Sequence, residues 1–89
     1  MLNKINIQKI ELSKKPAKVV FSFEDGTKAI FYGNTENGTC EIELSSTKKC
    51  PQAFEFIFLH TSIEDPQSSK FWFYLMEIIE DYKTLVYEG

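Results

Sequence analysis

The side chains in this chain that could act as a nucleophile or a general base are few: His60 and the thiols of Cys40 and Cys50. Nucleophilic catalysis needs a base within hydrogen-bonding reach of the nucleophile and an acid that orients the base. No motif brings His60 next to either thiol, and a lone histidine at the end of an apolar segment is typical of a hydrogen-bonded structural residue. We therefore expect His60 to be structural and predict no catalytic residues.

The cysteine spacing also argues against a metal site. Cys40 and Cys50 do not form a CxxC pair, and the chain has only one histidine to join them, so we predict no metal. The first ten residues mix apolar and charged side chains without the apolar core of a signal peptide. We expect a cytoplasmic protein with both thiols reduced. A Cys40–Cys50 disulfide in an oxidising compartment is the alternative.

Other catalytic patterns are also missing. The four glycines form neither GxGxxG nor GxxxxGK, so no phosphate-binding loop is indicated, and we predict no cofactor. The carboxylate pairs Glu64–Asp65 and Glu80–Asp81 are adjacent in the sequence, and neighbouring helix residues do not converge on one substrate atom. We predict that the protein is not an enzyme.

Charge distinguishes the two halves of the chain. Residues 1–49 carry eight lysines and six acidic residues (+2), whereas residues 50–89 carry two lysines and seven acidic residues (−5). The chain contains no arginine, the side chain best suited to bidentate contacts with guanine or phosphate. A sequence-specific DNA-binding function is therefore disfavoured, and the acidic half is suited to a basic partner.

Composition and chain length favour one small folded domain over residues 1–89. Hydrophobic residues make up 43% and charged residues 26% of the 89 residues, which excludes an intrinsically disordered chain. The longest uninterrupted apolar run is Phe71–Met76, too short to cross a membrane.

The first half of the sequence predicts strands. Ile5 and Ile7 are out of phase with Ile10 and Leu12, so we expect a β-bulge at residues 8–9. Alternating apolar residues then lead to Asp25-Gly26, the dipeptide typical of a two-residue hairpin loop. With a five-residue loop over residues 34–38, this hairpin predicts an apolar sheet face: Val19, Phe21, Phe23, Ile30, Tyr32, Cys40, Ile42 and Leu44.

The same register leaves Val20 and Phe31 paired on the opposite face, where they form a secondary candidate for binding. Residues 54–60 are apolar on both faces, which favours a buried strand; a helix opened by Pro51 is the alternative. Ser68 or Ser69 precedes a predicted helix over residues 70–87, with one apolar stripe for the sheet: Phe71, Leu75, Ile78, Ile79, Tyr82, Leu85 and Val86.

These elements predict an α+β fold. It has an antiparallel sheet of four to five strands, mostly a meander, with the C-terminal amphipathic helix packed on one face. Apolar residues extend around that helix beyond the stripe that one sheet would cover, and acidic residues flank them. If residues 54–60 do not cover this excess, the helix offers a partner-binding surface: Trp72, Phe73, Met76, Glu77, Glu80 and Asp81.

The function that we expect is therefore a non-enzymatic protein-binding module. It would act as a small inhibitor, immunity protein or adaptor that masks a larger, basic partner through the C-terminal helix. Two alternatives stay open. A single-stranded nucleic acid could stack on Phe31 of the sheet face, although the net charge of −3 disfavours this. The chain could also self-associate, as a homodimer, through the same helix surface.

Overall fold

The computed structural model describes residues 5–34, 36–46, 49, 51–81 and 86–88. Its elements follow the chain in the order β1 (Ile7–Lys14), β2 (Ala17–Phe23), β3 (Lys28–Gly33), β4 (Cys40–Ser45), α1 (Gln52–Ile63), α2 (Phe71–Asp81) and β5 (Val86–Glu88). The strands form one sheet in the order β4-β3-β2-β1-β5. Strands β1 to β4 are an antiparallel meander, and β5 lies parallel to β1. The predicted α+β class and meander are confirmed.

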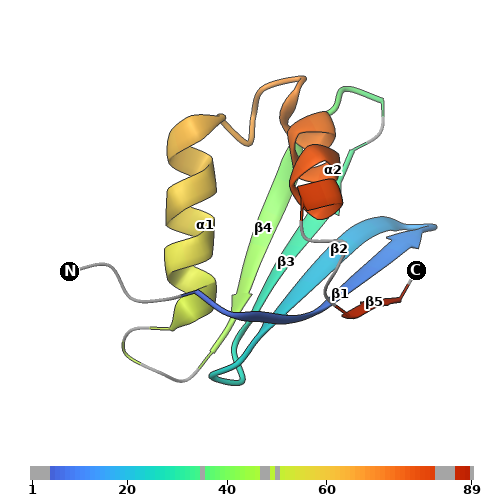
Figure 1. The fold of residues 1–89 in the computed structure, drawn as a ribbon. Helices are drawn as coiled ribbons and strands as arrows, with labels where there is room; N and C mark the ends of the chain where they lie inside the picture. Colours follow the sequence, from blue (N-terminus) through green and yellow to red (C-terminus); the bar gives the residue numbers. More distant parts are fainter. Residues whose placement is uncertain (1–4, 35, 47–48, 50, 82–85, 89) are drawn as a thin grey trace.

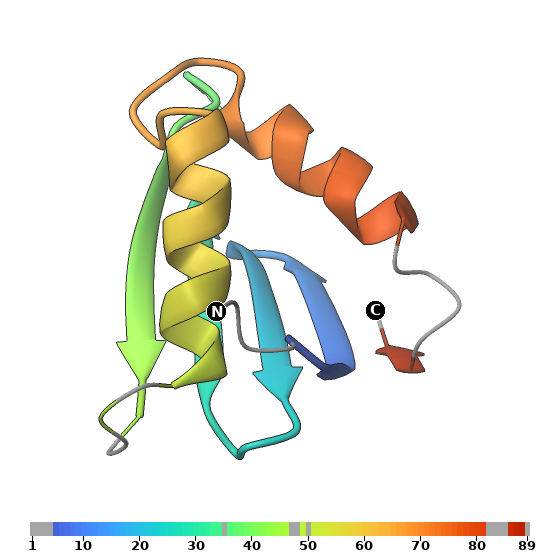
Figure 2. The same ribbon diagram turned by 60° about the vertical axis from the view of Figure 1, so that its left-hand side comes forward.

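Both helices lie on the same face of the sheet (Figures 1 and 2). Helix α1 lies at the β4 side, and α2 extends from the end of α1 toward the β1 side (Figure 2). The core between these layers is dominated by phenylalanine. Phe56 of α1 packs against Phe21 and Phe23 of β2, with ring centroids 4.6 and 5.2 Å apart, and Phe31 of β3 contacts both Phe21 and Phe71. The layers are therefore joined through aromatic rings.

The predicted bulge in β1 is confirmed. Ile7 pairs with Phe23 but Lys9 pairs with Ser22, so Gln8 is the extra residue. The bulge restores the alternation, because Ile7 and Ile10 both point into the core and are buried.

The β2–β3 hairpin forms as predicted, but its loop is one residue longer. Phe23 donates its backbone N–H to the Thr27 carbonyl, and Gly26 has a φ of +87°. This is the three-residue loop that ends in a left-handed glycine. Val20 therefore pairs with Ile30, and Val19 pairs with Phe31.

That one-residue shift overturns part of the predicted core face. Ala29 and Phe31 are buried, whereas Ile30 and Tyr32 lie on the opposite face. Cys40 and Ile42 lie on the core face as predicted, and Leu44 lies on the same face at the sheet edge, where 41% of it is exposed.

Residues 54–60 are helical, so the predicted strand is wrong and the alternative opened by Pro51 is correct. Pro51 is the N-cap of α1 and supplies no side-chain cap. The β2–β3 hairpin supplies one instead, because the Ala53 backbone N–H donates to Thr27 Oγ1 at 3.1 Å. The helix is therefore stabilised by contacts far away in the sequence.

The predicted C-terminal helix is correct only over its first part. Its apolar stripe at Phe71, Leu75, Ile78 and Ile79 is buried against the sheet layer. The helix ends at Asp81, and Val86–Glu88 form β5 rather than the last helical turn. Tyr82 and Leu85 lie outside the described residues.

Candidate interaction surfaces

His60 lies inside the protein between the two helices. Its Nδ1 lies 2.8 Å from the Tyr74 hydroxyl of α2, and its ring packs against Phe56 at a centroid distance of 4.5 Å. Nε2 is buried without a hydrogen-bond partner among the described residues, and desolvation lowers the pKa of the imidazole. These contacts hold α1 against α2 and leave His60 8% exposed.

Cys40 is a free thiol at the start of β4, and only 2% of the residue is exposed. Burial raises the pKa of this thiol to about 11, so the reactive thiolate is a minor species at neutral pH. Cys50 lies outside the described residues, so the predicted state of the pair is not addressed.

The described part of the chain has neither a metal-binding cluster nor a membrane-spanning helix. No group of three or more histidine, cysteine, aspartate or glutamate side chains there lies close enough to hold a metal ion. No helix there has the length and apolar character needed to cross a membrane.

The residues predicted on the C-terminal helix divide into two groups. Trp72 and Met76 are half-buried and pack against the core. The Trp72 ring lies over Gly33, which has no side chain to displace it. Phe73 is 67% exposed, and the acidic residues of the predicted surface, Glu77, Glu80 and Asp81, are also exposed. Four of the six predicted residues are therefore exposed, and Phe73 is the aromatic residue among them.

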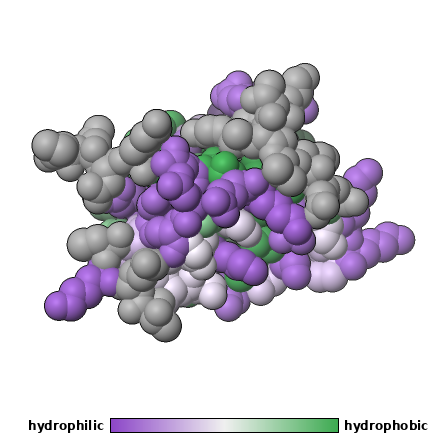
Figure 3. All heavy atoms as spheres, turned by 60° about the horizontal axis from the view of Figure 1, so that its bottom comes forward, coloured by the Kyte–Doolittle hydropathy of each residue, from purple (hydrophilic) through white to green (hydrophobic). Residues whose placement is uncertain are grey.

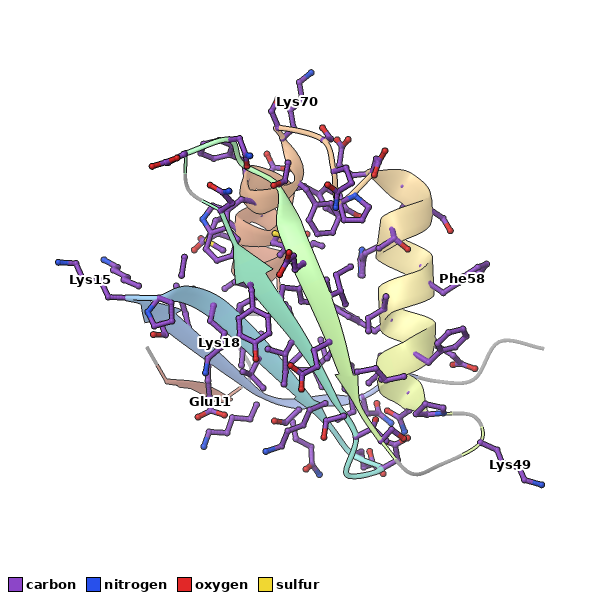
Figure 4. The ribbon with its side chains drawn as sticks, turned by 180° about the vertical axis from the view of Figure 1, so that it is seen from behind. Glu11, Lys15, Lys18, Lys49, Phe58 and Lys70 are labelled. Atoms are coloured by element: carbon purple, nitrogen blue, oxygen red, sulfur yellow. The ribbon has the colours of Figure 1, made fainter. Side chains whose placement is uncertain are left out.

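The secondary candidate on the outer sheet face does not exist as predicted. Phe31 is 0% exposed because the longer hairpin loop turns it into the core, and the apolar pair on the outer face is Val20 with Ile30. Lys18 and Glu11 extend from this face in Figure 4. Viewed from the lower end in Figure 1, the molecule presents mainly hydrophilic residues with small apolar areas between them (Figure 3).

A surface that the sequence analysis did not identify lies on α1. Four large apolar side chains of this helix are between 47% and 66% exposed: Phe54, Phe58, Leu59 and Ile63. Phe54 and Phe58 are stacked, with ring centroids 6.3 Å apart and an interplanar angle of 19°. We call these four residues the α1 face; the Phe54–Phe58 pair and the Leu59–Ile63 pair project about 140° apart around the exposed half of the helix. The sequence indicates these exposed residues by two apolar pairs at i, i+4 spacing on a helix that Pro51 opens, Phe54 with Phe58 and Leu59 with Ile63.

The edge of the sheet lies beside the α1 face. Strand β4 pairs with β3 on one side only, so its other side is an open edge in the described part of the structure. Figure 4 shows α1 at this edge, with Phe58 pointing away from the sheet. The helix that carries the exposed apolar residues and an unpaired strand therefore lie at the same side of the sheet.

Comparisons of the chain with protein-family models, with curated proteins and with solved structures found no significant match. The fold and its exposed surfaces are therefore the basis for the functional proposal.

Proposed function

We propose that this chain is a non-enzymatic protein-binding module, a small inhibitor or adaptor that masks a larger, basic partner. The observation that carries the proposal is the α1 face, where four large apolar side chains of one helix remain exposed. Aromatic side chains such as Phe54 and Phe58 are enriched at interface centres. Burying them against a partner removes apolar area from water, which favours association.

The acidic residues support a basic partner. The chain has a net charge of −3, and Glu77, Glu80 and Asp81 are exposed around Phe73 on α2. Such a distribution speeds association with a positively charged surface and discriminates against acidic ones. Phe73 with these carboxylates is a second contact region for the same partner.

The alternative of single-stranded nucleic acid has less support. Base stacking needs an aromatic ring on an exposed, basic surface, and Phe31 is buried in the core. The hydroxyl of Tyr32, which is 36% exposed on the outer face, donates to a glutamate, Glu43, at 3.1 Å. An acidic neighbour of this kind repels a phosphate backbone.

The test compares partner capture by three forms of the full chain from lysate of the cells that produce it. The forms are the wild type, a Phe54→Ser/Phe58→Ser variant and a Phe73→Ser variant. We expect a protein partner that the wild type retains and the double variant loses. Retention by all three would contradict the role of the α1 face. Loss with Phe73→Ser alone would move the main contact to α2. Light scattering of each form separates self-association from binding to another protein.

A further inference from the structure

The open edge of β4 presents backbone groups that are arranged to bind another strand. In the β3–β4 ladder Tyr32 pairs with Glu41 and Ile30 with Glu43. Asn34 donates its N–H to the Thr39 carbonyl, which sets the alternation of the antiparallel hydrogen bonds. The backbones of Glu41, Glu43 and Ser45 therefore form hydrogen bonds with β3. The residues between them, Ile42 and Leu44, direct their N–H and C=O groups away from β3.

A contact at the start of the strand supports this alternation. Cys40 has the same phase as Ile42, and its N–H donates outward to the Pro66 carbonyl at 2.9 Å. The loop between the helices thus already occupies the first outward position of the edge. No described residue forms such a hydrogen bond with Ile42 or Leu44, the next two outward positions. An added strand would pair there.

Leu44 is an exposed apolar side chain on the helix side of this edge. His60 points from α1 toward α2, where it meets Tyr74. At 100° per residue, Phe54 and Phe58 lie about 120° and 160° around the helix from His60, so both project away from the core side. Figure 4 shows Phe58 pointing away from the sheet. Leu44 itself is 41% exposed. A strand added to β4 would place alternate side chains on the helix side of the sheet, next to Leu44.

The opposite side of the edge is acidic. Glu41 and Glu43 are exposed on the outer face of β4, and no ion pair joins either of them to another described residue. If β4 of a second copy paired antiparallel with this strand, one central register would place Glu41 opposite Glu43 twice, and the next would place Glu43 opposite Glu43. Like charges directly opposite each other destabilise a strand pair. The charges therefore favour a basic segment over a second copy.

We propose that β4 binds an extended segment of a partner protein in which lysine or arginine alternates with apolar residues. The apolar side chains contact Leu44, the basic side chains contact Glu41 and Glu43, and the backbone pairs with Ile42 and Leu44. This proposal rests on the protein-binding function above and names its partner chemistry.

The probe is a labelled eight-residue peptide that alternates lysine and valine, and its binding to the full chain is followed by fluorescence anisotropy. We expect binding that weakens as salt is raised, because exposed charge pairs contribute to it. A peptide with glutamate in place of lysine should not bind. A third peptide, methylated on the backbone nitrogens that would pair, keeps every side chain and should bind at least about tenfold more weakly. Equal binding of any control peptide would overturn the proposal.

Variants of the protein test the same contacts. Leu44→Pro removes an outward N–H without removing a bond to β3, and Leu44→Ala is its matched control. We expect Leu44→Pro to weaken peptide binding about tenfold relative to Leu44→Ala. Glu41→Gln/Glu43→Gln keeps an acceptor for the Tyr32 hydroxyl and should abolish most of the salt dependence. Unchanged affinity in Leu44→Pro or in the glutamine variant would overturn the proposal.

Amide hydrogen exchange gives a readout that does not depend on any variant. The N–H groups of Ile42 and Leu44 should exchange rapidly in the free protein and slowly with the peptide bound. Unchanged exchange in the complex would overturn strand pairing. If the wild type has twice the monomer mass in solution and Leu44→Pro reduces that mass, the edge binds a second copy instead of a partner segment. A partner that requires Phe58 but tolerates Leu44→Pro would leave the protein-binding function intact and overturn the strand mode.

Discussion

Asp25 Oδ2 accepts a hydrogen bond of 2.8 Å from the backbone N–H of Gln52, which lies 27 positions later in the chain. The other oxygen, Oδ1, accepts from both the backbone N–H and the hydroxyl of Thr27. One carboxylate therefore bonds the loop of the β2–β3 hairpin and the first N–H group of α1. Its negative charge also lies at the positive end of the helix dipole. The hairpin and the helix that carries the α1 face are consequently coupled.

The first prediction concerns this cap. Asp25→Ala should lower the free energy of unfolding by about 1–2 kcal/mol, because it leaves the Gln52 N–H at the start of the helix without its acceptor. Urea denaturation measures the change. Glu24→Ala is the matched control, since Glu24 is exposed in the same hairpin and its side chain caps neither of the described helices. An equal effect of both substitutions would mean that the loss arises in the hairpin alone.

The second prediction compares two phenylalanines on α1. Phe56 is 1% exposed and contacts three rings of the sheet, so Phe56→Ala should cost about 3–5 kcal/mol. Phe58 is 66% exposed, so Phe58→Ala should change stability by less than about 0.5 kcal/mol. The same denaturation experiment measures both. A large loss with Phe58→Ala would show that the α1 face is part of the core.

The position of Phe31 explains why the sequence predicts the sheet but not all of its faces. The alternation in β2 and the Asp25-Gly26 dipeptide locate the hairpin. Its loop length depends on Asp25, whose carboxylate bonds Thr27 and Gln52. That second contact comes from a helix that local sequence does not reveal. Because the loop is one residue longer, Phe31 lies in the core in place of Ile30.

The same limit applies to both helices. Helix α1 is apolar on the core side and on the exposed side, so periodicity does not separate it from a buried strand. Pro51 is the local cue that favours a helix. The end of α2 and strand β5 depend on pairing between β5 and β1, which are far apart in the sequence. The buried stripe of α2 was predictable because it follows helical spacing over several turns.

The third prediction concerns the pH dependence of stability. Burial lowers the pKa of His60 in the folded state, so the unfolded state binds the proton more readily. The contribution of His60 is therefore fully present above its unfolded pKa of about 6.5 and is lost as the pH falls through the folded value. Unfolding free energies measured by urea between about pH 7.5 and 5.5 should decrease as the pH falls.

A direct measurement separates His60 from the carboxylates. His60 is the only histidine in the chain, so one imidazole signal in the proton NMR spectrum reports its titration. We expect a midpoint below the ordinary value, and His60→Gln should flatten the stability profile over the same range. A midpoint at or above the ordinary value would contradict the buried, neutral imidazole between Phe56 and Tyr74.

The fourth prediction distinguishes a packing role of Trp72 from a role as a binding anchor. A Cβ at Gly33 would lie 2.5 Å from Trp72 Cε3, so Gly33→Ala must displace the indole from the surface of β3. Such overpacking costs about 1–3 kcal/mol. Trp72 is the only tryptophan in the chain, so its fluorescence emission should shift to longer wavelength as the ring moves toward water.

Gly26→Ala is the control for this experiment. Nothing lies within 4 Å of a Cβ at Gly26, so that substitution strains a backbone with φ of +87° without touching the indole. It should lower stability and leave the emission maximum unchanged. If Gly33→Ala also leaves the emission unchanged, the indole does not pack on β3, and Trp72 is available to a partner together with Phe73. If the emission shifts, Trp72 packs α2 against β3, and Phe73 is the exposed aromatic residue that a partner of this helix contacts.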